Sequence, residues 1–504
     1  MKNITDSLQI VRGAIISFFG MIFGRGLTYL YVILLARLGS SEYGIISLGF
    51  AITLFLSTIT MMGLKTVIVR YISFYQAKKD NKKIKGTILS SIKISLPISI
   101  VFMISLFLLS DKISLLFFHN VRLIPILKLF SITIPFIVLS NIFLQVILSY
   151  KRIEYQIGIK EITENIVKLI LTFIVIYLGY NLFGVAIAYV ISIIFTFILS
   201  FYFMQKKCFN ILDNKIKSTN FSKTLLKISF PLFFADIFTL IIKWMDVFLL
   251  GFFRSTSEVG IFNVALSTAS LLVLVPTGIM ALFLPVITRL YSKGNVNEIK
   301  EITIRTSKWI FFANFPIFIL LLIFSKQILN IMFGQEYVAG STALLILIFA
   351  YLLHSITHVN SSILVMLKKT KIIFLVGIII TILNIILNLL LIPKYGIVGG
   401  AMAMSFSLIL NYIIYSILVY KITKIFTNWI TYLKFFASGI LSFLVIYLIK
   451  VKIENTIINL IILCLAFCII YFILSILFKS FDEQDKNIFF VTKNRFYSIL
   501  KIKS

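Results

Sequence analysis

The hydrophobic positions of this chain form long runs, separated by short clusters of charged and turn-forming residues. A helix needs about 20 predominantly apolar residues to cross the hydrocarbon core of a bilayer, so we interpret these runs as membrane spans. The pattern predicts an all-α polytopic membrane protein with about 14 transmembrane helices. Their predicted limits are 13–36, 44–64, 87–109, 123–149, 158–178, 182–204, 225–252, 259–284, 307–329, 341–366, 372–392, 396–420, 432–449 and 456–478.

The basic residues between the spans indicate how the chain is oriented. Most of the 48 Lys and Arg residues lie on the side that holds both termini, for example in 65–85, 206–223 and 289–308. The opposite side holds far fewer, namely Arg37, Lys112, Arg122, Arg254, Lys326, Lys394, Lys450 and Lys452. By the positive-inside rule, we expect a multi-pass protein of the plasma or inner membrane with both termini in the cytoplasm.

Composition supports a membrane protein and narrows the range of partners. Hydrophobic residues make up 60% of the 504 residues and the mean hydropathy is +1.06, far above the values of soluble domains. The net charge of +30 is spread in short basic bursts between apolar runs, so we expect no nucleic-acid partner. Cys208, Cys464 and Cys468 are too few and too scattered for a disulfide or zinc framework.

The connectors leave little room for catalysis. The longest, 65–86 and 205–224, are short and basic, and none approaches the size of a folded domain. No Ser-His-Asp set, phosphate-cradling loop or metal motif stands out in the sequence. We therefore expect no enzyme and no cofactor, apart from Na⁺ or H⁺ as a candidate coupling ion.

An internal repeat divides the chain. The run Arg37–Ile45 recurs at Arg254–Ile261, and Gly63 and Lys93 recur at nearly the same spacing. Each unit holds an even number of spans, so the two units should be related by an axis along the membrane normal. The predicted parts are 1–204 (spans 1–6), a cytoplasmic linker 205–224, 225–420 (spans 7–12), 421–478 (spans 13–14) and a cytoplasmic basic tail 479–504.

The predicted seventh span carries Asp236, Lys243 and Asp246. At about 100° per residue the three share one face of the helix. Intramembrane charges are costly, so this face should point into a bundle or a water-filled cavity and mark a substrate or ion pathway. The alternative is a Lys243–Asp246 pair, one turn apart, that neutralises itself.

Arg25 lies in the middle of the predicted first span. A guanidinium group suits bidentate capture of phosphate, which favours a contact with the substrate. The structural alternative is an ion pair with a carboxylate such as Asp236 in the other repeat unit.

Further polar side chains within the spans are candidates for the lining of a cavity. The set comprises His354, His358, Asn141, Gln145, Asn384 and Asn388. The two histidines, one turn apart, suit a proton relay or a sugar-binding strip, with hydrogen bonding between helices as the alternative. The amides either line the cavity or join helices. In the fifth span, Glu164 and Lys168 are spaced for an ion pair.

Three sequence elements resemble those of a known family. They are Leu34-Leu-Ala-Arg-Leu-Gly39 with Glu42-Tyr-Gly44, Asp246-Val-Phe-Leu-Leu-Gly251 with Glu258-Val-Gly260, and Tyr395-Gly-Ile-Val-Gly-Gly400. The chain resembles the multidrug/oligosaccharidyl-lipid/polysaccharide exporter superfamily in these elements, in the order of the elements and in the arrangement of its spans. The resemblance is to its polysaccharide-transport branch, the lipid-linked oligosaccharide flippases.

This resemblance implies two parallel-repeat six-helix lobes in a V around a central cavity, plus an extra C-terminal helix pair. It implies alternating access and a substrate that is a polyprenyl-phosphate type lipid-linked oligosaccharide, moved from the cytoplasmic to the outer leaflet. Related flippases carry cationic residues in the first span, where Arg25 lies here. Arg25 and Lys243 would attract the head group, while Asp236 and Asp246 hold these cations in place or bind a coupling ion.

Two alternatives to the flippase stay open at this point. An ion-coupled multidrug exporter of the same superfamily would move small cations, which Arg25 and Lys243 would repel. A non-transporting scaffold of a polysaccharide assembly complex would gain little from buried charges. For the flippase, the expected partners are the lipid-linked glycan, membrane lipids and polysaccharide assembly proteins, and spans 13–14 would border a groove for the prenyl chain.

Overall fold

The structure, a computed structural model, describes residues 2–425, 429–450, 457–482 and 485. Within these ranges all regular structure is helical and no strand occurs, which confirms the all-α prediction. The repeated units form two groups of helices. The first group contains α1 (Lys2–Ala36), α2 (Ser40–Thr60), α3 (Leu64–Ala77), α4 (Asn81–Lys112), η1 (Ile113–Phe117), α5 (Leu123–Ser131), α6 (Thr133–Ser149), α7 (Ile153–Ile157), η2 (Gly158–Thr163), α8 (Glu164–Tyr177) and α9 (Leu182–Lys207).

The second group begins after the connector that follows α9. It contains α10 (Ser222–Phe253), α11 (Thr256–Ala269), η3 (Ser270–Val273), α12 (Leu274–Ser292), α13 (Val296–Met332), η4 (Gln335–Gly340), α14 (Ser341–Met366) and α15 (Thr370–Thr423). Two further helices follow, α16 (Trp429–Lys450) and α17 (Ile457–Leu477). We call residues 40–207 the N-lobe and residues 256–423 the C-lobe.

Among the described residues, every predicted span falls on helical segments; the first residue of the span 456–478 lies outside them. Among the described residues, 10 helices are long and apolar enough to cross a membrane, or 11 if the pair α5 and α6, bent by 41°, forms one span. The remaining predicted spans lie on η2 with α8, on α17 and on one half of α15. Helix α15 has 54 residues, about 80 Å, which is more than twice the hydrocarbon thickness. It breaks at Gly396, whose φ of 55° and ψ of −128° favour glycine.

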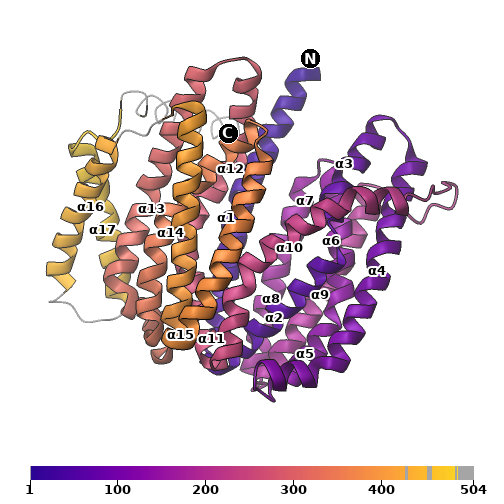
Figure 1. Cartoon of the computed structure of the whole chain (residues 1–504), viewed down its shortest axis with the longest axis horizontal. Helices are drawn as coiled ribbons and strands as arrows, with labels where there is room; N and C mark the ends of the chain where they lie inside the picture. Colours follow the sequence, from indigo (N-terminus) through magenta and orange to yellow (C-terminus); the bar gives the residue numbers. More distant parts are fainter. Residues whose placement is uncertain (1, 426–428, 451–456, 483–484, 486–504) are drawn as a thin grey trace, which may run out of the picture.

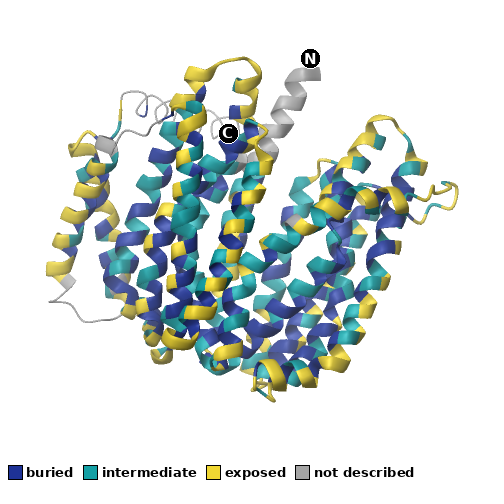
Figure 2. Ribbon diagram, viewed as in Figure 1, coloured by how far each residue is buried: buried dark blue, intermediate teal, exposed yellow. Residues whose placement is uncertain are grey.

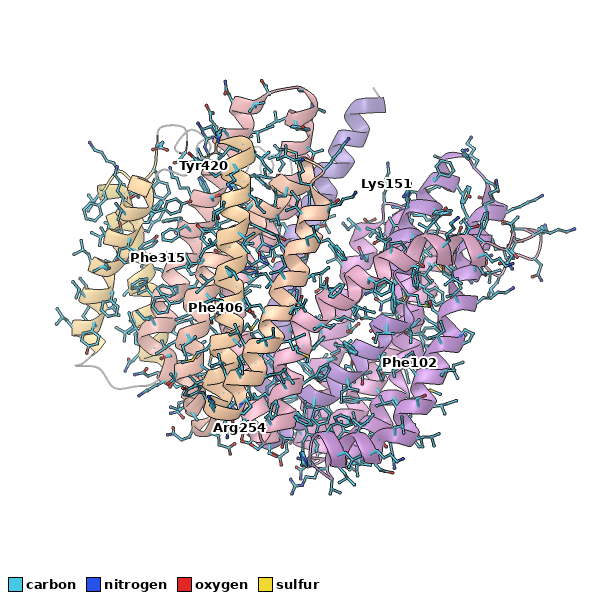
Figure 3. All side chains as sticks on the ribbon, viewed as in Figure 1. Phe102, Lys151, Arg254, Phe315, Phe406 and Tyr420 are labelled. Atoms are coloured by element: carbon cyan, nitrogen blue, oxygen red, sulfur yellow. The ribbon has the colours of Figure 1, made fainter. Side chains whose placement is uncertain are left out.

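The lobes converge at one end and diverge at the other, so the helices form a V (Figure 1). Arg254 lies at the converging end, whereas Lys151 and Tyr420 lie toward the diverging end (Figure 3). Buried residues gather inside each lobe, and exposed residues are frequent on the outer helices (Figure 2). Many of these exposed residues are large and apolar, such as Val101, Leu108 and Phe173, as expected of surfaces that face lipid.

The repeated motifs meet each other at the converging end, where α2 packs on α11. A Cβ atom on Gly44 would lie 1.7 Å from the carbonyl oxygen of Thr256, and one on Gly260 would lie 2.1 Å from that of Ser40. Only glycine allows the backbones to approach this closely. The Oγ atoms of Ser40 and Ser257 are hydrogen-bonded at 2.7 Å across the same contact. The two copies of the repeated motif thus form the close contact between the lobes at this end.

Helices α1 and α10 each contact both lobes. Helix α1 packs against α12 of the C-lobe and against α7, η2 and α8 of the N-lobe. Helix α10 packs against α15 of the C-lobe and against α2, α3 and α4 of the N-lobe. The first helix of each repeat unit therefore stands between the lobes and does not belong to one lobe alone.

The extra pair α16 and α17 packs against α13, on the side of the C-lobe away from the N-lobe (Figure 1). The chain after α17 folds back onto α13, where Lys308 Nζ donates hydrogen bonds to Asp485 and, at 2.9 Å, to Asp482. Trp309 Nε1 donates to Asp485 Oδ1 at 3.1 Å. Burial alone would raise the pKa of Asp485, but the hydrogen bonds from Lys308 and Trp309 outweigh it and hold this pKa below its usual value.

We expect Asp485→Asn to lower the free energy of unfolding by about 1.5–3 kcal/mol, the range for hydrogen bonds to charged groups. The pKa of Asp485 is lowered in the folded state. The stabilisation that Asp485 provides is therefore fully present above the ordinary pKa of Asp, and it is lost as the pH falls through the lowered pKa of the folded state. Thermal unfolding in detergent measures the change. The matched control is Asp482→Asn: its side chain is 73% exposed, so the change should cost less than about 1 kcal/mol. Equal losses of unfolding free energy in the two variants would contradict the inference that Asp485 holds the segment after α17 against α13.

Candidate functional site

Arg25 is exposed on α1 and close enough to Lys243 of α10 for an electrostatic interaction. On α1, Gly20 and Gly24 face η2 and its neighbour α7, whereas Tyr29 faces the C-lobe, where its hydroxyl lies 3.2 Å from Thr268 Oγ1. Two sides of the helix are thus occupied. At about 100° per residue, Phe23 lies on the far side of α1 from Arg25, and Phe23 is 55% exposed. Arg25 is also exposed, on the opposite side, which faces α10.

Two cationic side chains from other helices, Arg25 of α1 and Lys65 of α3, come near Lys243 here. Lys243 of α10 is close enough to Arg25 and Lys65 for electrostatic repulsion from both. We call Arg25, Lys65 and Lys243 the cation cluster. Lys243 Nζ also lies 5.0 Å from the ring centroid of Trp244. In the described part of the chain, no carboxylate oxygen lies within ion-pair distance of these three side chains.

The sequence pattern ends the second span at 64 and places Lys65 in a cytoplasmic connector. In the structure the chain turns at Gly63, with a φ of 71°, and continues as α3, which carries Lys65. The apolar spacing of Val67, Ile68 and Ile72, all buried, was the available signal that the helix continues.

The acidic residues of α10 have separate surroundings, which corrects the expectation of one shared charged face. Asp236 is half-buried and interacts electrostatically with Lys65 of α3. Asp246 is 2% exposed and accepts hydrogen bonds from the side-chain amides of Asn384 and Asn388 on α15. The alternative of a Lys243–Asp246 pair that neutralises itself is therefore wrong, because Asp246 turns into the C-lobe while Lys243 turns toward α1 and α3. An ion pair of Arg25 with Asp236 is also absent from the described contacts.

Asn384 and Asn388 are buried inside the C-lobe beside Asp246, and their role as cavity-lining residues stays a prediction. Asn388 Oδ1 is buried without a hydrogen-bond partner in the described residues. Tyr351 of α14 is also close enough to Asp246 for an electrostatic interaction. This carboxylate and its two amides form the second polar site of the molecule, which we call the Asp246 site.

The other candidates lie apart from the cation cluster. His354 and His358 stack edge to face on α14 with ring centroids 5.3 Å apart, and each has one buried ring nitrogen without a partner in the part of the chain described. Asn141 and Gln145 are half-buried on α6. Their role as cavity-lining residues stays a prediction.

The ion pair predicted in the fifth span is confirmed and extended. Glu164, 4% exposed, accepts a hydrogen bond from Lys168 at 2.6 Å and another from Lys160 at 2.7 Å. Glu164, Lys160 and Lys168 form a triad at η2, the segment against which α1 packs close to Gly24. The triad therefore links η2 to α8 next to the contact with α1, the helix that carries Arg25.

Known proteins share this fold and parts of the sequence. Residues 10–291 match the model of a family described as polysaccharide biosynthesis protein, and residues 231–390 match the MatE family model. The chain is 28% identical over 174 residues to the probable low-salt glycan biosynthesis flippase Agl15 of Haloferax volcanii, which covers 34% of this chain and 37% of that protein. It is 25% identical over 251 residues to the capsular polysaccharide biosynthesis protein CapF of Staphylococcus aureus, with coverages of 50% and 63%. The chain thus matches about a third of the length of the first relative and under two thirds of the second.

Two solved structures resemble the whole arrangement of helices. The lipid II flippase MurJ in an inward closed conformation superposes with a TM-score of 0.76 at 20% identity, covering 92% of this chain and 98% of that one. A multidrug resistance MATE family transporter in an inward-facing conformation gives a TM-score of 0.69 at 15% identity, with coverages of 82% and 98%. These likenesses show the fold, including its two lobes in a V. Because the matched residues 10–291 make up more than half of the chain, the chain belongs to the polysaccharide biosynthesis protein family.

Proposed function

We propose that this protein is a flippase that moves a lipid-linked oligosaccharide from the cytoplasmic to the outer leaflet by alternating access, for the assembly of a cell-surface glycan. The observation that carries the proposal is the cation cluster. It is built from α1, α3 and α10, and α1 and α10 contact both lobes. Family membership and a relative named as a flippase support the same function.

The chemistry of the cation cluster suits a phosphate-bearing head group. Like charges brought together at low dielectric repel each other, and an anion bound among them relieves this repulsion. Arg25 offers a planar fork for phosphate oxygens, and Lys243 and Lys65 add point charges. The hydrocarbon chain of the carrier can stay in lipid, so only the polar head has to cross between the lobes.

The Asp246 site is the candidate for coupling to an ion. It holds a buried carboxylate, two amide side chains and one amide oxygen without a partner in the described residues. Carboxylate and amide oxygens are the ligands that hard cations prefer, so these residues fit Na⁺, and a proton on Asp246 would serve the same purpose. A bound cation would compensate the negative charge that is otherwise buried. Asp246, Asn384 and Asn388 join α10 to α15, so the occupancy of this site would bias the packing of α10.

The second candidate function, ion-coupled export of drugs, has the MatE match over residues 231–390 in its favour. The charge of the site opposes it. A small cation would meet Arg25, Lys65 and Lys243 with one half-buried carboxylate, Asp236, beside Lys65, whereas the carboxylate Asp246 lies buried in the C-lobe.

Binding to the purified protein distinguishes the two functions. We expect a polyprenyl-diphosphate saccharide to bind at least about tenfold more tightly than the same saccharide on a phosphate-free polyprenol, since one charge-assisted contact gives about 1.5–3 kcal/mol. Added salt should weaken the diphosphate compound more than the neutral one. Equal affinity for the two compounds, or displacement of the saccharide by cationic drugs, would argue for the exporter.

Orientation is testable with single cysteines in a background that lacks Cys208, Cys464 and Cys468. We expect Val121→Cys, at the converging end, to react with an impermeant thiol reagent in intact cells. Lys82→Cys, at the start of α4, should react only after the membrane is opened. Both residues are exposed, so access to the reagent depends on the side of the membrane. Labelling of Lys82→Cys in intact cells would show that the protein has the opposite orientation, and the proposed direction of transport would then be wrong.

A further inference from the structure

A carboxylate joins the two lobes at their converging end. Glu336 Oε2 accepts a hydrogen bond from Ser40 N at 3.0 Å and another from Ser40 Oγ at 2.6 Å. Ser40 begins α2 of the N-lobe, whereas Glu336 lies on η4 of the C-lobe. The same Ser40 hydroxyl also contacts Ser257 of α11. Glu336 therefore bridges the lobes at the point where they meet.

Glu336 supplies a cap that α2 lacks in its own lobe. The residue before α2 is Gly39, which has no side chain and a φ of 117°. The first N–H groups of a helix have no partner within the helix, and the residue at the N-cap usually satisfies one of them. At α2 the carboxylate of Glu336 does so for Ser40, and a negative charge is favourable at this end of a helix. Helix α11 differs, because its own Ser255 side chain accepts a hydrogen bond from Glu258 N at 3.3 Å.

The turn that carries Glu336 is held firmly. Tyr337, the next residue, is 1% exposed and donates a hydrogen bond to Ala36 O at 2.9 Å. Arg37 Nε donates to Met332 O at 3.1 Å, at the end of α13. These contacts attach the end of α1 to the C-lobe. Separation of the lobes at this end would therefore break the contact between η4 and α2.

A second contact reaches across in the opposite direction. Asn120 of the N-lobe donates from Nδ2 to Thr256 Oγ1 at 3.0 Å, at the start of α11. Ser40 and Thr256 are equivalent positions of the internal repeat, so each lobe holds the first residue of a helix in the other. The contact of Asn120 is neutral, whereas that of Glu336 carries a charge. Charge-assisted hydrogen bonds are roughly twice as strong as neutral ones, so Glu336 should contribute more.

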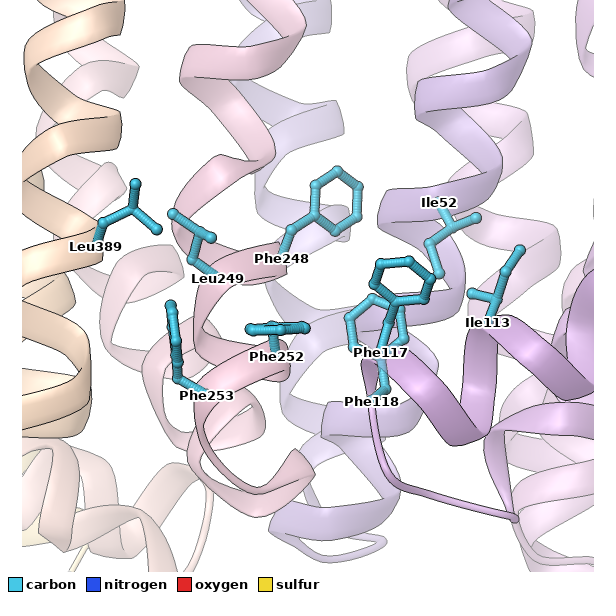
Figure 4. Close-up of a pocket in the computed structure, with 9 residues that line it drawn as sticks. All are labelled: Ile52, Ile113, Phe117, Phe118, Phe248, Leu249, Phe252, Phe253 and Leu389. Carbon is cyan, nitrogen blue, oxygen red and sulfur yellow. The ribbon is translucent and has the colours of Figure 1, made fainter.

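The lobes face each other across an apolar crevice close to these polar contacts (Figure 4). Its volume is about 450 Å³, and its walls come from α2 and η1 of the N-lobe and from α10 and α15. All nine lining residues are hydrophobic, so they supply no side-chain hydrogen bond between the walls. Apolar surfaces can separate in a bilayer at little cost, because lipid tails are equally apolar. We therefore expect the polar contacts to resist separation more strongly.

We propose that Glu336 is a positioning residue of the outer gate, by which we mean the contact between the lobes at the converging end. It caps α2 only while this end is closed, and it thereby favours the state that is open toward the cytoplasm. The proposal rests on the proposed function, since alternating access requires the converging end to open. Glu336 is exposed, so water can replace its partners when the lobes separate. The contact thus sets the ratio of the two states without preventing the change.

Distances between spin labels test this role without any substrate. Val121→Cys on the N-lobe and Lys394→Cys on the C-lobe place labels at two exposed positions near the converging end, in a background without native cysteines. We expect Glu336→Ala to raise the ratio of long to short distances about three- to tenfold, as for the loss of a partly solvated charge-assisted contact. Glu336→Gln keeps one acceptor oxygen and should cause a smaller shift.

The matched control is Glu42→Ala. It also removes a carboxylate at the start of α2, but Glu42 pairs with Arg122 at 3.3 Å within the N-lobe. The distances should therefore stay as in the protein with native Glu42. Unchanged distances in Glu336→Ala, or equal shifts in Glu336→Ala and Glu42→Ala, would overturn the proposed role.

A disulfide tests whether the gate must open for transport. The hydroxyls of Ser40 and Ser257 are 2.7 Å apart, so the double variant Ser40→Cys with Ser257→Cys places two thiols within bonding reach. We expect the oxidised double variant to stop translocation of a lipid-linked glycan in proteoliposomes, and a reductant to restore it. Translocation by the cross-linked protein at the rate of the reduced protein would overturn the gate. Failure of the wild-type protein to translocate would instead contradict the proposed function, while the spin-label distances still test Glu336.

Discussion

Arg25→Ala is expected to slow translocation of a lipid-linked glycan about 10- to 150-fold, with unchanged insertion into the membrane. The factor corresponds to the loss of a charge-assisted contact of about 1.5–3 kcal/mol. Removing a charge from the middle of a span favours insertion, so the protein should still reach the membrane. The measurement is glycan translocation in proteoliposomes, normalised to the amount of inserted protein.

Two variants control for the effect of Arg25→Ala. Arg25→Lys keeps the charge but loses the fork geometry and should retain part of the activity. Arg289→Ala removes an exposed arginine from the end of α12, away from the cation cluster, and should act as wild type. Wild-type transport by inserted Arg25→Ala would show that the side chain does not bind the head group.

Asp246→Asn is expected to slow transport by about 10- to 150-fold, again without loss of insertion, because the charge that a coupling ion would compensate is removed. The neighbours Asn384 and Asn388 can hydrogen-bond an amide at this position, which preserves the local packing. The residual transport should no longer respond to an imposed gradient of Na⁺ or H⁺. Proteoliposomes with and without each gradient separate the two coupling ions.

The location of Asp246 also predicts the result of a double change. If Lys243 and Asp246 neutralised each other, Lys243→Met combined with Asp246→Leu would be active. The structure places the two side chains in different surroundings, so we expect the double variant to be at least as impaired as either single variant. Full activity of the double variant would mean that neither residue has a role in transport.

The sequence predicted what depends on local pattern. The spans follow from apolar runs of membrane length, and the Glu164–Lys168 pair follows from residues one turn apart. The repeat of Gly44 as Gly260 indicated two related units, although only the structure shows that the two glycines touch. These features need no knowledge of which helices are neighbours.

The missed features depend on how distant helices pack. The partners of Asp246 come from α15, and its direction cannot be read from spacing on α10 alone. Lys65 joins the cation cluster because the chain turns at Gly63 and continues as α3. Asp485 binds Lys308 because the segment after α17 folds back onto α13. Each of these depends on contacts between residues far apart in the chain.

The central claim is that the cation cluster moves a diphosphate-linked glycan across the membrane. It is tested most directly by wild-type protein in proteoliposomes that carry a polyprenyl-diphosphate saccharide in one leaflet. Access of an impermeant saccharide-modifying enzyme to the other leaflet reports translocation. We predict that the saccharide becomes accessible faster than in protein-free vesicles and faster than with Arg25, Lys65 and Lys243 all changed to Gln. Accessibility no faster than in protein-free vesicles, or equal rates for wild type and the triple variant, would contradict the account.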